Sequence, residues 1–474
     1  MQQPTFSVHQ HRPLFASLAI FTLITAMVLC QLFARDILQG IYVVLALLVV
    51  FSTFILLLRP RAILCAALVY LASPVPMMLS PAYSGLITGM LLINCVIGTL
   101  LTAGPRVFLL PFKSLRMPLF ISAASILVVG YGLSRANSPA YVFGDLYQIF
   151  EFGAVFLLTT ALVTSEEQWR SIVNLLLGCI IFASVLQLAD AAMGADYLPR
   201  LEQFGVSIPR TINLNAPIAC CAIFALLPNA KKQQKFLLAC VAILAVNLVM
   251  GFTRGLWLAA FLSLVFLLFL QRGKERRTTL KLVFVSALIF VAGLSIFTLG
   301  SAKFLKIIQE RVAYSVTQYE SASGNEEVLS ARRLIEYVLI GSQIPEHPIL
   351  GKGLGATYEI SGAAVIQGPA DEKVDYHYIH NLYLLIAFRL GIPALLAFLV
   401  LLWKYFRNSI RIYRSSSLSP GNSALMAGLI ASMFGEVALS MTSPTFLNHP
   451  TAGILACIMA LTLVVPRLSS PAPA

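Results

Sequence analysis

Residues 236–270 read FLLACVAILAVNLVMGFTRGLWLAAFLSLVFLLFL, two long apolar runs on either side of a short turn that contains Arg254. Crossing about 30 Å of hydrocarbon takes roughly 20 apolar residues in a helix, because each residue adds about 1.5 Å. With their flanks, at 235–252 and 255–271, the runs approach that length. The stretch therefore predicts a hairpin of two membrane-spanning helices with its turn at a membrane surface.

The same kind of run recurs along the whole chain. Of its 474 residues 58% are hydrophobic and only 11% are charged, with a mean hydropathy of +0.85, which excludes an ordinary soluble globule. The expected fold is an all-α polytopic membrane protein of about 14 transmembrane helices (12–14) with one large periplasmic loop. The predicted spans are 14–33, 37–58, 62–80, 82–103, 117–134, 145–163, 171–190, 213–229, 235–252, 255–271, 281–299, 381–405, 422–441 and 450–466.

Lysine and arginine are distributed unevenly between alternate loops. One set of alternate segments holds 20 of the 33 basic residues but only 3 of the 20 acidic ones. Because basic loops stay on the cytoplasmic side during insertion, this pattern predicts cytoplasmic termini and places 300–379 outside. The net charge of +13 is then a signal of topology, so no nucleic-acid partner is expected.

The long polar segment divides the chain into three predicted parts. Residues 1–299 form the N-terminal part of the transmembrane bundle, 300–379 a periplasmic loop domain, and 380–474 the C-terminal part of the bundle. Apolar residues recur at helical spacing in 304–319 and 329–344, which predicts two amphipathic helices. The loop is therefore expected to be a folded cap over the mouth of the bundle.

Arginines gather on the predicted outer face. A guanidinium in a two-helix turn suits capture of a phosphate group, and Arg254 has this position; the alternative is an interfacial arginine beside the belt residue Trp257. Arg210 and Asn215 precede a helix whose free N–H groups can bind anions, although capping explains Asn215 equally well.

Arg332 and Arg333 lie in the second predicted amphipathic helix of the loop. The alternative to a substrate-binding role is a solvated charge paired with Glu326 or Glu336. The segment after this helix, PILGKGLG at 348–355, has glycines that would allow close approach of a phosphate. No strand–turn–helix pattern surrounds it, so a sharp turn is favoured over a nucleotide site.

A histidine, His380, precedes the predicted span 381–405, next to Asn381 and Tyr383. A histidine at the start of a helix faces the positive end of the helix dipole, which favours the neutral imidazole that can accept a proton. This is the property of a general base, and the alternative is a hydrogen-bonded interfacial histidine.

Two charged residues fall inside predicted spans. Arg389 lies about 12 Å below the start of its span, and Glu436 lies about 8 Å below the outer end of the next. Buried ions need partners, so these depths predict a structural ion pair between Arg389 and Glu436, with Glu151 at a similar level.

These motifs together resemble the O-antigen ligase and Wzy-type polymerase superfamily. The resemblance is carried by Arg254-Gly255, by RLIEY at 333–337, by PILGKGLG at 348–355, and by His380-Asn381 followed by Gly391. It implies a metal-independent, inverting glycosyltransferase of the GT-C type, without a cofactor, in the bacterial inner membrane with its active site facing the periplasm. The implied partners are an undecaprenyl-pyrophosphate-linked glycan donor, a lipid A-core or growing glycan acceptor, and membrane lipids.

The resemblance also assigns roles to the residues. His380 would be the catalytic base, and Arg254 and Arg333 would stabilise the pyrophosphate. The expected substrate-binding residues are Arg210, Arg332, Asn381, Tyr383, Trp257 and Asn215.

Four other functions stay open from the sequence, one of them a non-enzymatic scaffold, which would have no need for arginines and a histidine gathered at one face. Ala394 and Pro393 depart from the ligase pattern, and Arg389 stands where many members have an acidic residue, so a Wzy-type O-antigen or exopolysaccharide polymerase is the first alternative. Transfer to a protein is a second. A lipid-linked glycan transporter is more distant, because its charges should lie near the bilayer midplane.

Overall fold

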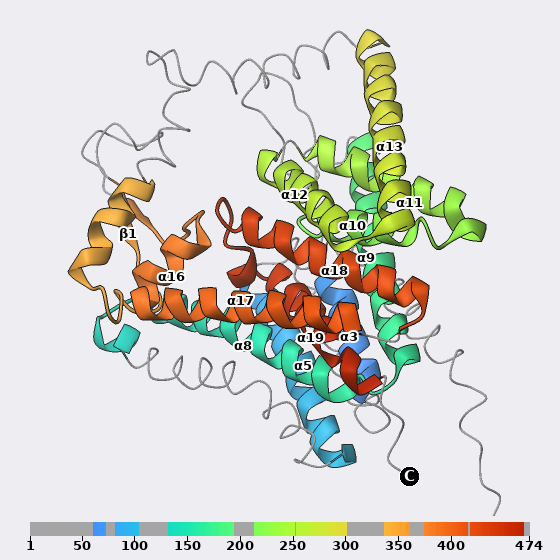
Figure 1. The fold of residues 1–474 in the computed structure, drawn as a ribbon. Coiled ribbons are helices and arrows are strands. Elements are labelled where there is room, and N and C mark those ends of the chain that lie inside the picture. The colour runs from blue at the N-terminus through green and yellow to red at the C-terminus, as the bar shows by residue number, and fades with distance from the viewer. Residues whose placement is uncertain are drawn as a thin grey trace, which may run out of the picture.

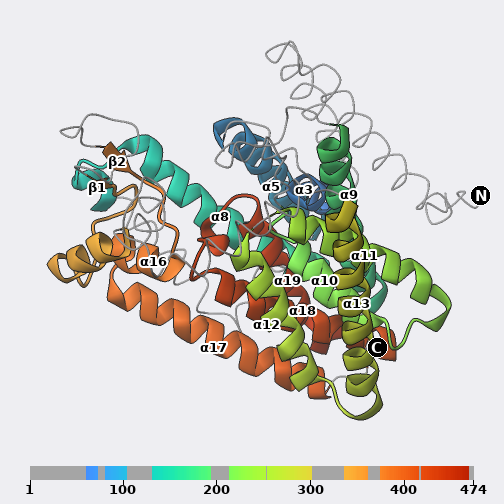
Figure 2. The same cartoon turned by 90° about the horizontal axis from the view of Figure 1, so that it is seen from above.

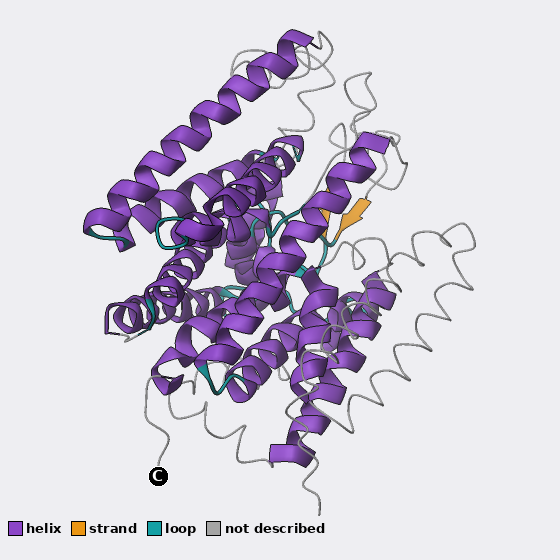
Figure 3. Ribbon diagram, turned by 90° about the vertical axis from the view of Figure 1, so that its right-hand side faces the viewer, coloured by secondary structure: helices purple, strands orange, loops and turns teal. Residues whose placement is uncertain are grey.

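The computed structural model describes residues 60–72, 81–103, 131–193, 213–251, 253–300, 336–360, 374–415 and 418–468. Most of them are helical, and they include one short two-stranded ribbon (Figure 3). Three predicted spans, 14–33, 37–58 and most of 117–134, lie outside these residues, as does the predicted helix 304–319. The sequence prediction of a mostly helical protein is confirmed.

The helices with both ends defined follow one another in this chain order. Those before residue 301 are α3 (Pro60–Ala72), α5 (Pro81–Ala103), α8 (Pro139–Leu162), α9 (Glu166–Met193), α10 (Ala216–Leu226), η4 (Lys231–Gln233), α11 (Gln234–Met250), α12 (Arg254–Leu270) and α13 (Gly273–Gly300). Those after it are η5 (Ile344–Glu346), α16 (Leu382–Leu390), α17 (Ile392–Ser415), α18 (Pro420–Leu439), η7 (Thr445–Leu447) and α19 (Thr451–Leu468). Several begin at a proline, which is well suited to the first turn of a helix.

Four described helices are long and apolar enough to cross a membrane. They are Pro139–Leu162, Glu166–Ala189, Lys231–Met250 and Pro420–Leu439, and shorter apolar helices accompany them. The most buried of the four is α18, in which 78% of the apolar stretch is buried inside the protein. It packs against α10 and α12 through small residues: a Cβ on Gly428 would lie 2.6 Å from Ala222 Cα. Close packing of small residues is typical of helices in membranes.

One predicted span is two helices and not one. Residues 381–405 were expected to form a single helix, but the helix breaks at Gly391 between α16 and α17. Gly391 has φ +85°, a conformation that interrupts a right-handed helix and that residues with a side chain rarely adopt. The N–H of Ile392 donates to the carbonyl of Pro348 at 2.8 Å, so the loop segment 348–355 supplies an acceptor for a backbone N–H at the break.

Residues 336–360 and 374–380 form a small folded unit at one end of the bundle. Residues 336–343 are helical, as the second amphipathic pattern predicts, and β1 (Tyr358–Ile360) pairs antiparallel with β2 (Val374–Tyr376). Ile340, Tyr358, Ile379 and Phe388 share a buried apolar cluster, which joins this unit to α16. The unit and α16 lie together at one end of the molecule, from which α17 runs toward the other end (Figures 1 and 2).

Candidate functional site

His380 and Glu336 form a hydrogen-bonded dyad. Asn381 caps α16 by accepting from the N–H groups of Tyr383 and Leu384, and this cap places His380 immediately before the helix. Glu336, at the start of helix 336–343, is only 2% exposed. Its Oε1 accepts the backbone N–H of His380 at 2.7 Å, and its Oε2 lies 2.8 Å from His380 Nδ1. The carboxylate therefore fixes both the backbone and the ring of the histidine.

This arrangement selects one tautomer of the His380 imidazole. An ionised carboxylate only accepts hydrogen bonds, so Nδ1 carries the proton and Nε2 carries a lone pair. Nε2 forms no hydrogen bond within the described part of the chain, and 35% of the His380 side chain is exposed. Tyr378 supports the ring edge-on, with centroids 4.9 Å apart. The dyad thus presents an oriented proton acceptor.

The turn that follows α18 joins the dyad to the Arg254 hairpin. The carbonyl of Ser440 accepts the N–H of Leu382 at 2.9 Å, two residues after His380. The carbonyl of Met441 accepts the hydroxyl of Tyr337 at 3.2 Å, next to Glu336. On the other side a Cβ on Gly255 would lie 2.7 Å from Thr442 Oγ1. The segments of three motifs, 253–255, 336–337 and 380–382, therefore converge on residues 439–442, which we name the convergence turn.

The predicted arginines are described only in part. Arg254 begins α12, so the backbone of its hairpin lies beside the convergence turn, while its side chain is outside the described residues. Arg210, Arg332 and Arg333 also lie outside them. By sequence Arg333 precedes Glu336 by three positions, which is helical spacing. Their roles therefore stay predictions.

The other predicted binding residues form contacts within the fold. The Trp257 Nε1–H donates to the Leu248 carbonyl at 2.7 Å, and the ring remains 43% exposed. The Tyr383 hydroxyl donates to the Val437 carbonyl at 2.7 Å, and Asn215 is buried at the start of α10. The Asn215 Oδ1 is buried without a hydrogen-bond partner among the described residues. The substrate-binding roles of Trp257, Tyr383, Asn215 and Asn381 stay predictions.

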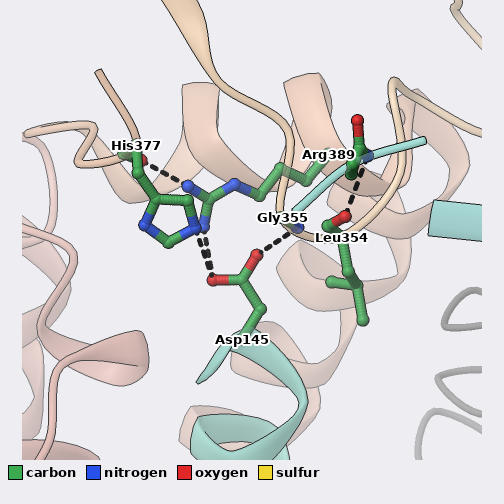
Figure 4. Close-up of polar contacts among 6 residues, drawn as sticks. Asp145, Leu354, Gly355, His377 and Arg389 are labelled. Carbon is green, nitrogen blue, oxygen red and sulfur yellow. Dashed lines mark hydrogen bonds and ion pairs between the residues drawn. The ribbon is translucent and has the colours of Figure 1, made fainter. Parts of the chain in front are cut away.

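The predicted pair between Arg389 and Glu436 is wrong. Arg389 Nη1 lies 2.7 Å from Asp145 Oδ1, and its Nη2 donates to the carbonyl of His377 (Figure 4). Asp145 Oδ2 also accepts the N–H of Gly355 at 2.7 Å. Both carboxylate oxygens of Glu436 are buried without a hydrogen-bond partner among the described residues. Arg389 does pair with a buried acid, but the acid comes from α8 and not from α18. Depth in the membrane does not determine how a helix is rotated about its axis, and this rotation decides which side chains meet.

Asp145 and Glu336 are the residues that the sequence predictions missed. Asp145 opens the predicted span 145–163, so an acid at a span boundary was the available signal. Glu336 was considered only as a partner for the neighbouring arginines. Glu151 does not join Arg389 either, because it pairs with His449 at 2.6 Å.

The glycine-rich segment 348–355 is a turn, as favoured from the sequence. Gly351, Gly353 and Gly355 have φ values of +68°, +90° and +75°. The segment runs against the end of α16, where the Lys352 and Gly353 N–H groups donate to the carbonyls of Phe388 and Arg389 at 2.7 and 3.0 Å. Its glycines permit this close approach of two backbones.

Fold and site together define a class: a helical membrane protein with an oriented histidine–carboxylate dyad at one end of its bundle. Residues 239–399 match the family described as O-antigen ligase. This match confirms the resemblance to the O-antigen ligase and Wzy-type polymerase superfamily, and it supports a function of ligase or polymerase type in polysaccharide assembly. Comparison with curated proteins finds no match. The matched region contains Arg254, Glu336 and His380 but neither Asp145 nor the convergence turn.

Proposed function

We propose that this protein transfers a glycan from undecaprenyl pyrophosphate to a hydroxyl of an acceptor sugar at the periplasmic face of the inner membrane. The acceptor would be lipid A-core, which makes the protein an O-antigen ligase. One observation carries the proposal: the buried Glu336 carboxylate holds His380 at Nδ1, and Nε2 has no hydrogen bond to any described residue, within the segment that matches the O-antigen ligase family. The uneven distribution of basic residues supports the orientation.

In the proposed reaction Nε2 of His380 takes the proton of the acceptor hydroxyl as its oxygen attacks the anomeric carbon. The bond from that carbon to the pyrophosphate oxygen breaks, and undecaprenyl pyrophosphate leaves with the electron pair. Attack from the opposite face inverts the anomeric carbon. Glu336 stabilises the imidazolium that forms, without itself touching the substrate.

Arg254 and Arg333, with Arg210 and Arg332 as further contacts, would bind the pyrophosphate and stabilise its growing negative charge. The positions of the two motifs support this assignment. Gly255, in the Arg254 hairpin, and Tyr337 both contact the convergence turn, so the backbones of 253–255 and 336–337 lie at the end of the bundle that holds the dyad. Residues 300–379 would cover the site as a cap and exclude water.

The test is complementation of a strain from which the gene has been deleted, with surface polysaccharide resolved as a ladder on a gel. We expect His380→Ala and Arg254→Ala to abolish the ladder while glycan accumulates on its lipid carrier. His347→Ala is the matched control and should leave the ladder unchanged, because the ring of this partly exposed histidine contacts Arg135, at 3.0 Å, and takes no part in the dyad. A wild-type ladder from His380→Ala protein that has inserted normally would refute the proposal. Single repeats on lipid A-core would identify a polymerase instead.

A further inference from the structure

A second histidine–carboxylate pair lies outside the region that matches the family. His449, just before α19, has its Nδ1 2.6 Å from Glu151 Oε2 in α8 and its Nε2 2.5 Å from Ser84 Oγ in α5. The hydroxyl of Tyr70 in α3 donates to the same Ser84 oxygen at 3.1 Å. Glu151 and Ser84 are fully buried, and 12% of the His449 side chain is exposed.

The order serine, histidine, carboxylate is that of a nucleophilic triad, but the surroundings argue against such chemistry. Ser84 has no exposed surface, and its oxygen is hydrogen-bonded to both Tyr70 and His449, so no substrate can reach it in this arrangement. The network instead attaches His449 to three helices from the N-terminal part of the chain, α3, α5 and α8. A buried carboxylate needs its donor, which makes this attachment strong.

The segment 440–448 connects that attachment to the site. At its far end the convergence turn contacts Leu382, Tyr337 and Gly255, as described above. Between the ends the segment is internally braced, since Ser440 Oγ lies 2.7 Å from Thr445 Oγ1.

The middle of the segment is also packed on both sides. The ring of Phe446 lies between Phe152 of α8 and Phe398 of α17, with centroids 6.2 and 5.6 Å away. A braced segment of this kind transmits a displacement at His449 to the convergence turn, because packed interiors have little room to deform.

We propose that Glu151, His449 and Ser84 are positioning residues, which fix segment 440–448 and through it the Glu336–His380 dyad. This inference rests on the proposed function. A displacement of about 1 Å in a reacting group can lower a rate about 100-fold, so a small shift of the convergence turn is enough to affect turnover. Donor binding, which is assigned to the arginines, should change much less.

The experiment uses full-length protein in proteoliposomes, with lipid-linked glycan and lipid A-core extracted from the deletion strain as substrates. We expect Glu151→Gln and His449→Leu to lower kcat by about tenfold or more while KM for the donor stays within about twofold. His449→Asn should recover most of the turnover, because its amide N–H takes the place of Nδ1–H toward Glu151. Thr99→Val is the control, because this buried hydroxyl donates to the Cys95 carbonyl within its own helix, α5, and does not belong to the Glu151–His449–Ser84 network.

Wild-type kcat in the inserted Glu151 and His449 variants would overturn the inference, as would equal losses in His449→Asn and His449→Leu. If the charge-changing variants are degraded, Ser84→Ala decides: it leaves the Glu151–His449 pair in place and should lower kcat about threefold. An unchanged kcat in Ser84→Ala would then refute positioning. His380→Ala in the same assay tests the proposed function separately, since its retained activity would defeat that function whatever the other variants do.

Discussion

Glu336→Gln changes one atom of the dyad and reverses its proton arrangement. Glu336 accepts two hydrogen bonds from His380, one from the backbone N–H and one from Nδ1–H. Glutamine has a single acceptor oxygen, and the backbone N–H can only donate, so this oxygen stays with the backbone. The amide NH2 then faces Nδ1, which must accept, and the imidazole proton moves to Nε2. The histidine keeps its place but loses the lone pair that the reaction needs.

The size of the effect follows from the role of the lost group. A positioned general base contributes about 10²–10⁴ in rate, and each tenfold corresponds to about 1.4 kcal/mol. We therefore expect kcat to fall about 10²–10⁴-fold, or about 3–5 kcal/mol of transition-state stabilisation. KM for the lipid-linked donor should change little, because Glu336 is buried beneath the ring and does not contact the donor in the proposed arrangement.

Turnover is measured in proteoliposomes for Glu336→Gln, His380→Ala and the double variant. Since Glu336 acts through His380, the double variant should be no slower than His380→Ala alone. Glu346→Gln is the matched control, because this exposed carboxylate lies 3.7 Å from Lys352 and belongs to no dyad. A wild-type kcat in Glu336→Gln, or a double variant much slower than His380→Ala, would refute the tautomer argument.

Two further predictions concern the supports of the site and are checked by thermal unfolding of purified protein in detergent. Gly391→Ala should destabilise the protein by about 2 kcal/mol or more, because φ is +85° and a Cβ would collide with the carbonyl of Ile349. Gly144→Ala is the control: this glycine lies inside α8 with nothing within 4 Å of an added Cβ, so the substitution should be neutral or stabilise the protein by up to about 1 kcal/mol. Asp145→Asn should lower the free energy of unfolding by about 3–5 kcal/mol, because it leaves the buried Arg389 charge unpaired. The double variant Asp145→Leu, Arg389→Met should recover much of that stability. An Asp145→Asn variant as stable as the wild type would contradict the pairing.

The sequence predicts what depends on local pattern. Runs of apolar residues locate the helices, and helical spacing locates the amphipathic helix that contains Glu336. The break at Gly391 also has a local signal, since Gly391 and Pro393 stand inside the apolar run. Hydropathy does not distinguish a glycine or proline that breaks a helix from one that a helix accommodates. The predicted span 381–405 therefore joined α16 to α17.

The partners of buried groups could not be predicted in this way. Asp145, Glu151 and Glu436 are all acids within or at the edge of a span, so depth alone offers Arg389 three candidates. Which one it meets depends on how the helices pack and how each is rotated, and this is decided by side-chain shape across the whole bundle. The structure selects Asp145, assigns Glu151 to His449, and leaves Glu436 without a hydrogen-bond partner among the described residues.

The convergence turn shows how the proposed site can depend on a segment that no sequence motif marks. Its contacts with Leu382 and Tyr337 are made by backbone carbonyls, which every residue has, so no residue type marks them in the sequence. The family match ends at residue 399 and therefore includes the dyad but not the turn at 439–442. His380, Arg254 and Arg333, which are proposed as the catalytic residues, thus lie inside the match. Of the proposed positioning residues, Ser84 and Glu151 precede the match and His449 follows it. A fragment limited to 239–399 would contain His380 and Glu336 but lack the contacts of Leu382 and Tyr337 with the convergence turn.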